Sequence, residues 1–418
     1  MSEQREIFVY ADWSWLNGPK FMGSLFAMPS RGKEVFYFEY DSDWLKNEAQ
    51  LLDPSLTLSS GRQFTPQGHE NFGVFMDSAP DRWGNMIMQR REAVNARKEE
   101  RPKRELNPSA YLLGVHDGPR VGGLRFKLSK DGPFLDDDHK MASPPVARLR
   151  ELEQAAWIVE QEISDDSEYE KWLKLLIAPG GSLGGARPKA SVKYPDNHLW
   201  IAKFPSHGDE FDRGAWEYIV HLIAKEVGVI VSDSDLKIFS GKQHTFLTKR
   251  FDRTASGQRI HFASAMTMLE RQDGDDASKG ASYFELAEFL IQYGAKTNGD
   301  LEQLWMRIVF NICVSNVDDH LRNHGFLLTS TGWTLAPAYD LNPSESAHGL
   351  KLNISEDDNS LDLDLAREVA DVFRVSKKRA DQIIKKVQLA VRDWQKYATK
   401  AGITASEQGR MSSAFRLP

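Results

Sequence analysis

The stretch 315–324 constrains this chain most, because it gathers carboxylate, amide and imidazole side chains directly after an apolar segment. The apolar segment, 304–314, predicts a buried helix. Two short apolar runs after the stretch predict a strand hairpin, which is joined by a turn rich in Thr, Ser and Gly. The sequence therefore predicts that Asp318 and Asn323 lie near one end of a rigid hairpin, with Asp340 just beyond its other end.

The order of Asp318, Asn323 and Asp340 suits phosphoryl transfer. Protein kinases use an Asp as catalytic base, an Asn five residues later for one magnesium ion, and a separate Asp for magnesium at the phosphates. Mg²⁺ prefers hard oxygen ligands from carboxylates, amides and water. Taken alone, this stretch could also be an acidic surface loop with an asparagine turn. Other parts of the chain are therefore needed to distinguish a kinase site from such a loop.

The glycine-rich stretch 178–192 is the second informative region. Its glycines allow backbone amides to approach a phosphate closely, and Arg187 and Lys189 add positive charge. Pro188 excludes a Walker A loop, which needs Gly immediately before its Lys. A plain flexible loop is the alternative, so the stretch gains meaning only from the segments after it.

The order of the next segments favours a kinase. Lys203 lies in the strand-like run 199–205, where a kinase lysine would contact the α and β phosphates, although an exposed lysine is the alternative. A later run, 246–253, would connect two lobes and hold the adenine through backbone groups. From residue 283 onward the chain is mainly helical, and we expect 406–418 to be disordered. The sequence predicts an α+β, two-lobed protein-kinase-like fold.

We expect three sections along the chain. Residues 1–140 would form an extra N-terminal subdomain with a small β-containing part and helices. Residues 141–252 would form a mixed α/β N-lobe with the glycine-rich loop and Lys203. Residues 253–418 would form a mainly helical C-lobe that carries the catalytic and metal-binding loop.

Composition excludes several classes of protein. The 41% hydrophobic and 27% charged fractions of the 418 residues are those of an ordinary globular protein. The net charge of −7 provides no global basic field for nucleic acid or an anionic membrane. The one cysteine, Cys313, excludes an intramolecular disulfide. Because the chain shows no signal region and no apolar run of about 20 residues, we expect a cytoplasmic protein without a membrane partner.

Short motifs occur along the chain in a recognisable order: 77–81 (DSAPD), 182–189 (SLGGARPK), 202–205 (AKFP), 249–253 (KRFDR), 316–323 (NVDDHLRN) and 337–340 (PAYD). Together they resemble the motifs of the HipA toxin kinases of bacterial type II toxin–antitoxin systems. The resemblance spans roughly 75–345. It implies ATP- and Mg²⁺-dependent phosphorylation of serine or threonine in a cellular protein, such as an aminoacyl-tRNA synthetase.

The resemblance also implies roles for single residues. Asp318 would be the catalytic base, and Asn323 and Asp340 would bind Mg²⁺. Lys203 would contact the phosphates, Lys249 and Phe251 would lie at the adenine-binding connector, and His320 would lie near the nucleotide. The full set implied for the nucleotide is Ser182, Gly184, Gly185, Ala186, Lys189, Lys203, Lys249, Phe251, His320 and Asp340.

The same resemblance implies a mode of regulation and a set of partners. Ser182 falls where the family carries an autophosphorylated serine, whose modification ejects the phosphate-binding loop and inactivates the kinase. Adding roughly two negative charges beside a polyphosphate site would favour that ejection. A loop hydroxyl without a regulatory role is the alternative for Ser182. The resemblance implies a HipB-like helix-turn-helix antitoxin as partner, with DNA contacted mainly through the antitoxin.

The chain departs from the family pattern in places. Asp319 stands where a Gly is common, His324 is an additional imidazole, and the run 259–264 lacks the acidic, Gln-containing pattern of members with synthetase substrates. These departures leave the protein substrate open. A small-molecule kinase of the aminoglycoside or choline type and a catalytically silent, antitoxin-binding scaffold are the alternatives. The intact set of Lys203, Asp318, Asn323 and Asp340 argues against the scaffold.

Overall fold

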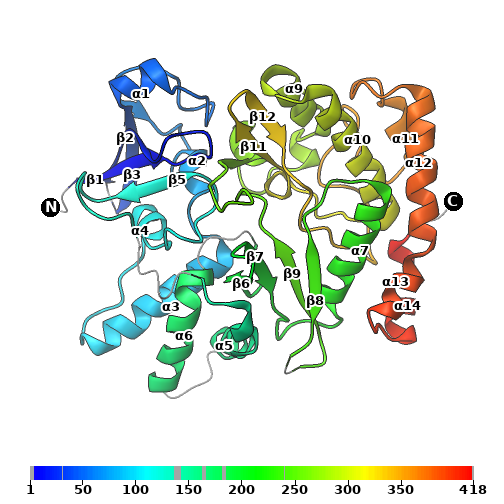
Figure 1. Cartoon of the computed structure of the whole chain (residues 1–418), viewed down its shortest axis with the longest axis horizontal. Coiled ribbons are helices and arrows are strands. Elements are labelled where there is room, and N and C mark those ends of the chain that lie inside the picture. The colour runs from blue at the N-terminus through cyan, green and yellow to red at the C-terminus, as the bar shows by residue number, and fades with distance from the viewer. Residues whose placement is uncertain are drawn as a thin grey trace. The chain divides into compact units, whose positions relative to one another are not determined.

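The computed structural model describes residues 4–30, 32–135, 143–161, 166–180, 185–239 and 241–416 (Figure 1). The chain divides into two compact units. Unit 1 comprises Met1–Gly208 and Asp252–Ala263, and unit 2 comprises Asp209–Phe251 and Ser264–Pro418. The chain therefore leaves unit 1, returns to it for one short segment, and leaves again. The division into 1–140, 141–252 and 253–418 stays a prediction.

Unit 1 begins with a five-stranded antiparallel sheet in the order β4-β3-β2-β1-β5. Its strands are β1 (Arg5–Ala11), β2 (Lys20–Ser30), β3 (Lys33–Tyr40), β4 (Gln63–Phe64) and β5 (Leu124–Lys127). Aromatic rings cover one face of this sheet: Phe75 packs 5.5 Å from Phe38 and 6.2 Å from Phe126, between ring centroids. In antiparallel strands, side chains that alternate between the two faces place one set of residues against the core, and here that set is aromatic.

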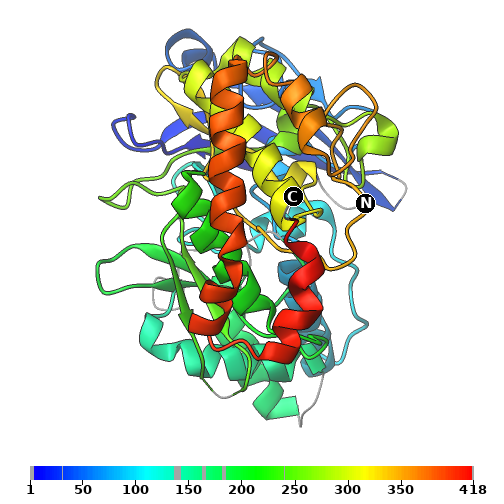
Figure 2. The same cartoon turned by 90° about the vertical axis from the view of Figure 1, so that its right-hand side faces the viewer.

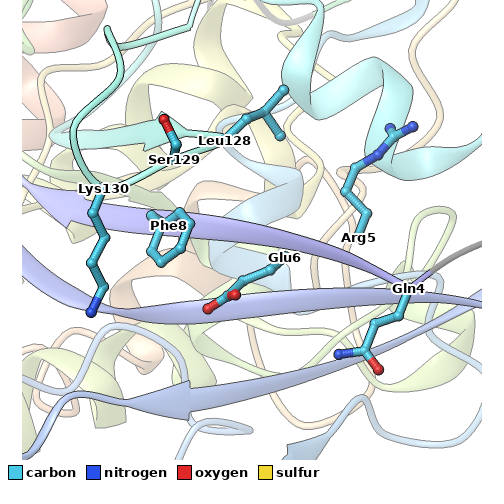
Figure 3. Close-up of a pocket in the computed structure, with 7 residues that line it drawn as sticks. All are labelled: Gln4, Arg5, Glu6, Phe8, Leu128, Ser129 and Lys130. Carbon is cyan, nitrogen blue, oxygen red and sulfur yellow. The ribbon is translucent and has the colours of Figure 1, made fainter.

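A pocket of about 700 Å³ lies where β5 stops pairing with β1 (Figure 3). Its charged side chains already have contacts within unit 1. Arg5 donates to the Ser109 hydroxyl at 3.4 Å, Glu6 accepts from the Ser24 hydroxyl at 2.7 Å, and the Lys130 ammonium lies 5.2 Å from the centre of the Phe21 ring. We assign no ligand to this pocket.

Helices and one hairpin complete unit 1. The helical segments are α1 (Ser42–Asn47), α2 (Gly73–Met76), α3 (Arg82–Lys98), α4 (Pro108–Leu113), η1 (Val146–Arg148), α5 (Leu149–Gln161) and α6 (Asp166–Gly180). Helix α6 packs against α3 and α5, and the antiparallel hairpin of β6 (Lys189–Lys193) and β7 (Leu199–Lys203) comes after it in the chain. The Asp81 carboxylate caps α3 by accepting the Arg82 N–H, and so fixes where that helix begins.

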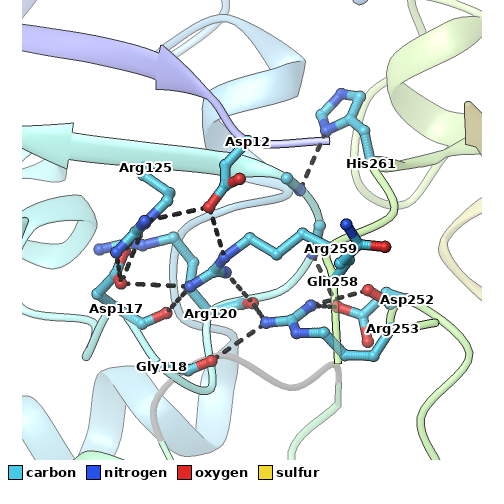
Figure 4. A network of polar contacts seen from close by, with 12 residues as sticks. Asp12, Asp117, Gly118, Arg120, Arg125, Asp252, Arg253, Gln258, Arg259 and His261 are labelled. Carbon is cyan, nitrogen blue, oxygen red and sulfur yellow. Dashed lines mark hydrogen bonds and ion pairs between the residues drawn. The ribbon is translucent and has the colours of Figure 1, made fainter. Parts of the chain in front are cut away.

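A buried ionic network ties the returning segment 252–263 to the rest of unit 1 (Figure 4). Arg259 donates to the Asp117 carbonyl at 2.6 Å and lies 3.3 Å from its carboxylate. The Asp252 carboxylate accepts the Gly122 N–H at 2.9 Å. Arg120, which is fully buried, donates to three backbone carbonyls. Arg259 pairs with Asp117, and Arg120 is held by backbone carbonyls, so each of these buried charges has polar partners.

Unit 2 is built around α10 (Thr297–Val314), whose residues from Leu304 onward are all buried. Its other helical segments are α7 (Arg213–Val227), α8 (Ala265–Met268), η2 (Ala277–Lys279), α9 (Tyr283–Tyr293), η3 (Leu321–Asn323), α11 (Leu363–Glu368), α12 (Lys377–Arg392), α13 (Trp394–Lys400), α14 (Ala405–Met411) and η4 (Ser412–Ala414). Its hairpins pair β8 (Ser234–Lys237) with β9 (Thr245–Lys249), and β11 (Gly325–Thr329) with β12 (Gly332–Leu335). A short strand, β10 (Phe262–Ser264), spans the boundary with unit 1. Within the described ranges, no helix is both long and apolar enough to cross a membrane.

The C-terminal end of unit 2 corrects one expectation. Residues 406–416, which we expected to be disordered, fold as α14 and η4, and Figure 2 shows α14 turning back after α13. The Glu407 carboxylate accepts from the Asp212 N–H at 3.0 Å and from the Trp216 indole at 2.8 Å. Phe415 stacks on Trp394 at 4.4 Å between centroids. The prediction was wrong because these partners lie far away in the sequence.

Candidate functional site

The catalytic-loop candidate begins where α10 ends. Ser315 caps the helix with a left-handed backbone, φ +50°, which turns the chain sharply into the loop. The Asn323 amide nitrogen donates to the Asp318 carbonyl at 2.7 Å. Because the nitrogen is used in this way, the Asn323 amide oxygen is the atom of this side chain that can accept a hydrogen bond or bind a metal. The Asp318 side chain is 66% exposed, so it can reach a substrate.

Asp340 lies on a second loop that is tied to the first. Its backbone is also left-handed, φ +57°, a conformation that a non-glycine residue keeps only where the surroundings impose it. The Asn342 side chain donates to the Asp340 carboxylate at 3.1 Å. The Asn342 N–H donates to the Asn316 amide oxygen, also at 3.1 Å. The structure thus brings the Asp340 loop onto the first residues of the candidate catalytic loop.

Of the two connector residues in unit 2, Phe251 lies against the same loops. The Phe251 ring lies 5.6 Å from the Tyr339 ring, between centroids. The Tyr339 hydroxyl donates to the Arg322 carbonyl at 2.8 Å. Lys249 ends β9, and its N–H donates to the Asp233 carbonyl at 2.8 Å. Phe251 is therefore joined to the loop of Asp318 through Tyr339.

The two loop histidines differ in their surroundings. The His320 Nε2 lies 3.8 Å from the Asp318 carboxylate, and its side chain is 37% exposed. His324 is buried, its ring lies edge-on to Tyr283, and burial lowers the pKa of His324 to about 3. Across the described part of the chain, no three His, Cys, Asp or Glu side chains gather in a metal-binding group. Mg²⁺ does not need such a group, since it commonly takes one or two protein oxygens, waters and substrate phosphates.

In unit 1, the motif at 77–81 leads into the contacts that hold the end of the glycine-rich stretch. The Gly185 N–H donates to the Asp81 carboxylate, and the Trp83 N–H donates to the Gly185 carbonyl at 3.4 Å. The Trp83 indole donates to the Lys189 carbonyl at 3.0 Å. Gly185 has φ +91°, and a Cβ there would lie 2.8 Å from the Lys189 ammonium, so a glycine suits this position. We did not predict these roles of Asp81 and Trp83 from the sequence, although the motif itself was a signal.

Lys189 and Lys203 face each other directly across the β6–β7 hairpin. Directly opposite residues of an antiparallel pair project from the same face, so both lysines come from one face of the hairpin. Ala186 is exposed next to Gly185, whereas Ser182 and Gly184 lie outside the described residues. Lys203 belongs to unit 1, and Asp318, Asn323 and Asp340 belong to unit 2.

Within the candidate catalytic loop, Asp319 has an environment that the sequence did not predict. Its side chain is buried although its neighbour Asp318 is exposed. It accepts from the Tyr283 hydroxyl at 2.5 Å and from the Lys351 N–H at 2.7 Å. Burial raises the pKa of Asp319 to about 6, and the Asp318 charge adds to this, although the two hydrogen bonds partly oppose it.

The raised pKa of Asp319 predicts a pH dependence of stability. Above about pH 6 the carboxyl is ionised in both states, and its burial costs stability in full. As the pH falls from about 6 towards the ordinary Asp value of 3.8, the folded state binds the proton first, so this cost is relieved. We expect wild type to gain about 1.4 kcal/mol in unfolding free energy relative to Asp319→Asn between pH 7 and pH 5.

Urea unfolding of both proteins at the two pH values measures this difference. The Asn variant serves as the control, because every other titrating group is common to both proteins. A difference that does not change with pH, or that favours the variant at pH 5, would contradict the predicted shift.

Known proteins resemble this chain in sequence. Residues 181–394 match the family model of the HipA-like C-terminal domain. A protein of Haemophilus influenzae named "Putative kinase" is 28% identical over 179 residues, which cover 38% of this chain and 52% of that protein. Toxin YjjJ of Escherichia coli is 24% identical over 318 residues, which cover 73% of this chain and 63% of that protein. The chain thus spans less than two thirds of either relative's length.

A solved structure gives the likeness in fold. It is the complex of HipA, HipB and operator DNA from the Shewanella oneidensis toxin–antitoxin system. The match has a TM-score of 0.66 at 16% identity and covers 98% of this chain and 94% of that chain. The predicted α+β, protein-kinase-like fold is therefore confirmed. Because the family match takes in more than half of the 418 residues, this chain belongs to the HipA family, defined by the HipA-like C-terminal domain.

Proposed function

We propose that this protein is an ATP- and Mg²⁺-dependent serine/threonine protein kinase that acts as the toxin of a toxin–antitoxin pair. The observation that carries the proposal is the candidate catalytic loop, where one hydrogen bond joins the exposed Asp318 to Asn323, whose amide nitrogen is the donor. Membership of the HipA family and relatives named as a kinase and a toxin support it.

In this proposal each residue has a distinct task. Asp318 accepts the proton of the substrate hydroxyl as that oxygen bonds to the γ-phosphorus and ADP leaves. Asn323 and Asp340 hold Mg²⁺, which when bound neutralises charge on the phosphates. The phosphates are contacted by Lys203 and by the residues of the glycine-rich stretch, Ser182, Gly184, Gly185, Ala186 and Lys189. Lys249, Phe251 and His320 lie around the rest of the nucleotide.

The proposed partners are a HipB-like helix-turn-helix antitoxin and a protein substrate, such as an aminoacyl-tRNA synthetase. Support for the antitoxin comes from the Shewanella structure, in which HipA is bound with HipB and operator DNA. DNA would be contacted mainly through the antitoxin, because the net charge of −7 provides no global attraction for a polyanion.

We also propose that the protein inactivates itself by phosphorylating Ser182. The test is intact-mass analysis after incubation with Mg²⁺ and ATP, with wild type beside Ser182→Ala. We expect wild type alone to gain one phosphate, mapped to Ser182, because the serine lies in the stretch expected at the γ-phosphate.

Two other outcomes separate the alternatives. If neither protein gains phosphate while ATP binds with Mg²⁺ present, self-phosphorylation is wrong, and a screen of small hydroxylated compounds then tests the small-molecule kinase. If ATP does not bind at all, by calorimetry with Mg²⁺ present, the kinase proposal is wrong and the antitoxin-binding scaffold is favoured.

A further inference from the structure

A continuous chain of hydrogen bonds runs beneath the catalytic loop, within unit 2. It consists of six contacts: Asn342 side chain to Asp340 carboxylate at 3.1 Å, Asn342 N–H to Asn316 at 3.1 Å, Asn316 to Asn311 at 3.0 Å, Asn311 to Tyr283 hydroxyl at 3.1 Å, Tyr283 hydroxyl to Asp319 at 2.5 Å, and Lys351 N–H to Asp319 at 2.7 Å. We call these residues the buried polar chain. It joins Asp340 to the residue immediately after Asp318.

The donors and acceptors in the buried polar chain match at every step. Asn316 accepts from the Asn342 N–H and donates its N–H₂ to the Asn311 oxygen. Asn311 in turn donates its N–H₂ to the Tyr283 hydroxyl. Tyr283 accepts from Asn311 and donates to Asp319, which uses both functions of its hydroxyl. Asn311, Asn316, Tyr283 and Asp319 are all buried, with exposures of 3% or less. A fully satisfied polar network in a low-dielectric interior specifies one arrangement of its members.

The far end of the buried polar chain is anchored by backbone contacts. The Lys351 carbonyl accepts the Ala277 N–H at 2.7 Å, and the Tyr283 N–H donates to the Asn353 carbonyl at 3.0 Å. Tyr283 is also the first residue of α9, where Ser282 and Glu285 form a capping box. The Tyr283 ring thus starts from a rigid helix end and reaches the catalytic loop with its hydroxyl.

We propose that the buried polar chain is a positioning device, in which Tyr283 and Asp319 hold Asp318 and Asp340 in one fixed arrangement for phosphoryl transfer. The effect on phosphoryl transfer rests on the proposed kinase function, whereas the fixed arrangement of Asp318 and Asp340 does not depend on it. Asp319 turns inward to Tyr283 while Asp318 faces outward, so the Tyr283–Asp319 bond fixes the direction of the catalytic carboxylate. Tyr283 and Asp319 act through Asp318 and touch no substrate.

The test is Tyr283→Phe, which removes one hydroxyl and keeps the ring. We expect the maximal rate at which the protein incorporates phosphate into itself from labelled ATP to fall by about 10- to 100-fold. The half-saturating ATP concentration should change little, because nucleotide contacts are untouched. Amide hydrogen exchange without nucleotide should become faster in 316–324 and 340–342. The matched control is Tyr37→Phe, another buried ring, whose hydroxyl accepts from Gln4 at 3.1 Å in unit 1; it should leave both readouts unchanged.

A second variant keeps the proposal open to refutation. Asp319→Asn disturbs the same link, because Asp319 accepts the Tyr283 hydroxyl and the Lys351 N–H with different oxygens, and the amide replaces one of these oxygens by an N–H₂ donor. The double variant with Tyr283→Phe should therefore be no slower than the slower single variant. If the rate of the double variant falls by the product of the two single fold-losses, Tyr283 and Asp319 act independently, and the proposed positioning device is wrong.

The exchange measurement separates the two proposals. If Tyr283→Phe matches wild type in rate or in exchange of the loop, the positioning device is wrong, while the kinase proposal still stands on the wild-type rate. If wild type binds no ATP with Mg²⁺ present, the kinase proposal fails. Faster exchange in 316–324 of Tyr283→Phe then still supports the arrangement of the buried polar chain, and unchanged exchange overturns it.

Discussion

Replacing Asp318 by asparagine is expected to lower the rate of phosphate incorporation by about 10²- to 10⁴-fold, the usual contribution of a general base. The amide cannot accept the hydroxyl proton of the substrate, although it keeps nearly the same shape. Because the side chain is 66% exposed and its backbone carbonyl still accepts from Asn323, folding should be unaffected. Calorimetry with ATP and Mg²⁺ should show binding close to that of wild type.

The matched control for this experiment is Asp357→Asn, which removes an exposed carboxylate from another loop of unit 2. It should keep the wild-type rate. An Asp318→Asn protein that retains that rate would show that another group accepts the proton, and it would remove the central assignment of the site.

The largest expected effect on stability comes from Arg120→Met. Arg120 is fully buried, donates to the carbonyls of Ser78, Leu112 and Val115, and lies 4.7 Å from the centre of the Phe126 ring. Burial lowers the pKa of Arg120 to about 9, yet the group stays charged at neutral pH. Removing it leaves the three carbonyls unsatisfied and the buried network short of one positive charge. We expect a loss of about 3–5 kcal/mol in unfolding free energy.

Denaturation by urea, followed by tryptophan fluorescence, measures this loss. Arg148→Met is the control, because its partner Glu151 is exposed and such pairs contribute about 0–1 kcal/mol. Equal midpoints for Arg120→Met and Arg148→Met would contradict the importance of the buried network in unit 1.

Local patterns predicted the elements that carry the site. The apolar segment 304–314 lies within α10, and the two apolar runs after the loop form β11 and β12. Such patterns suffice because a buried helix, a turn and a hairpin are each determined by neighbouring residues. The match of motif order to one family then supplied the kinase-like fold, which no single motif could have established.

The missed features all depend on partners far apart in sequence. Asp319 reaches Tyr283 across 36 positions, and Asp81 reaches Gly185 across 104. An acidic residue in a polar loop is indistinguishable, from its neighbours alone, from one that turns inward to a buried hydroxyl. The C-terminal residues were expected to be disordered for the same reason, since Glu407 bonds to Asp212 across 195 positions.

The return of residues 252–263 to unit 1 has a consequence for the newly made protein. A nascent chain that has emerged only to residue 208 carries Asp117 and Arg120 but lacks Asp252 and Arg259, which complete their network. The N-terminal unit therefore cannot finish folding on the ribosome until the segment after Phe251 has left the exit tunnel, and by then the start of unit 2 has emerged as well. Domains usually fold as units in order of synthesis; here the first unit has to wait for a segment of its own that is made only after the start of the second.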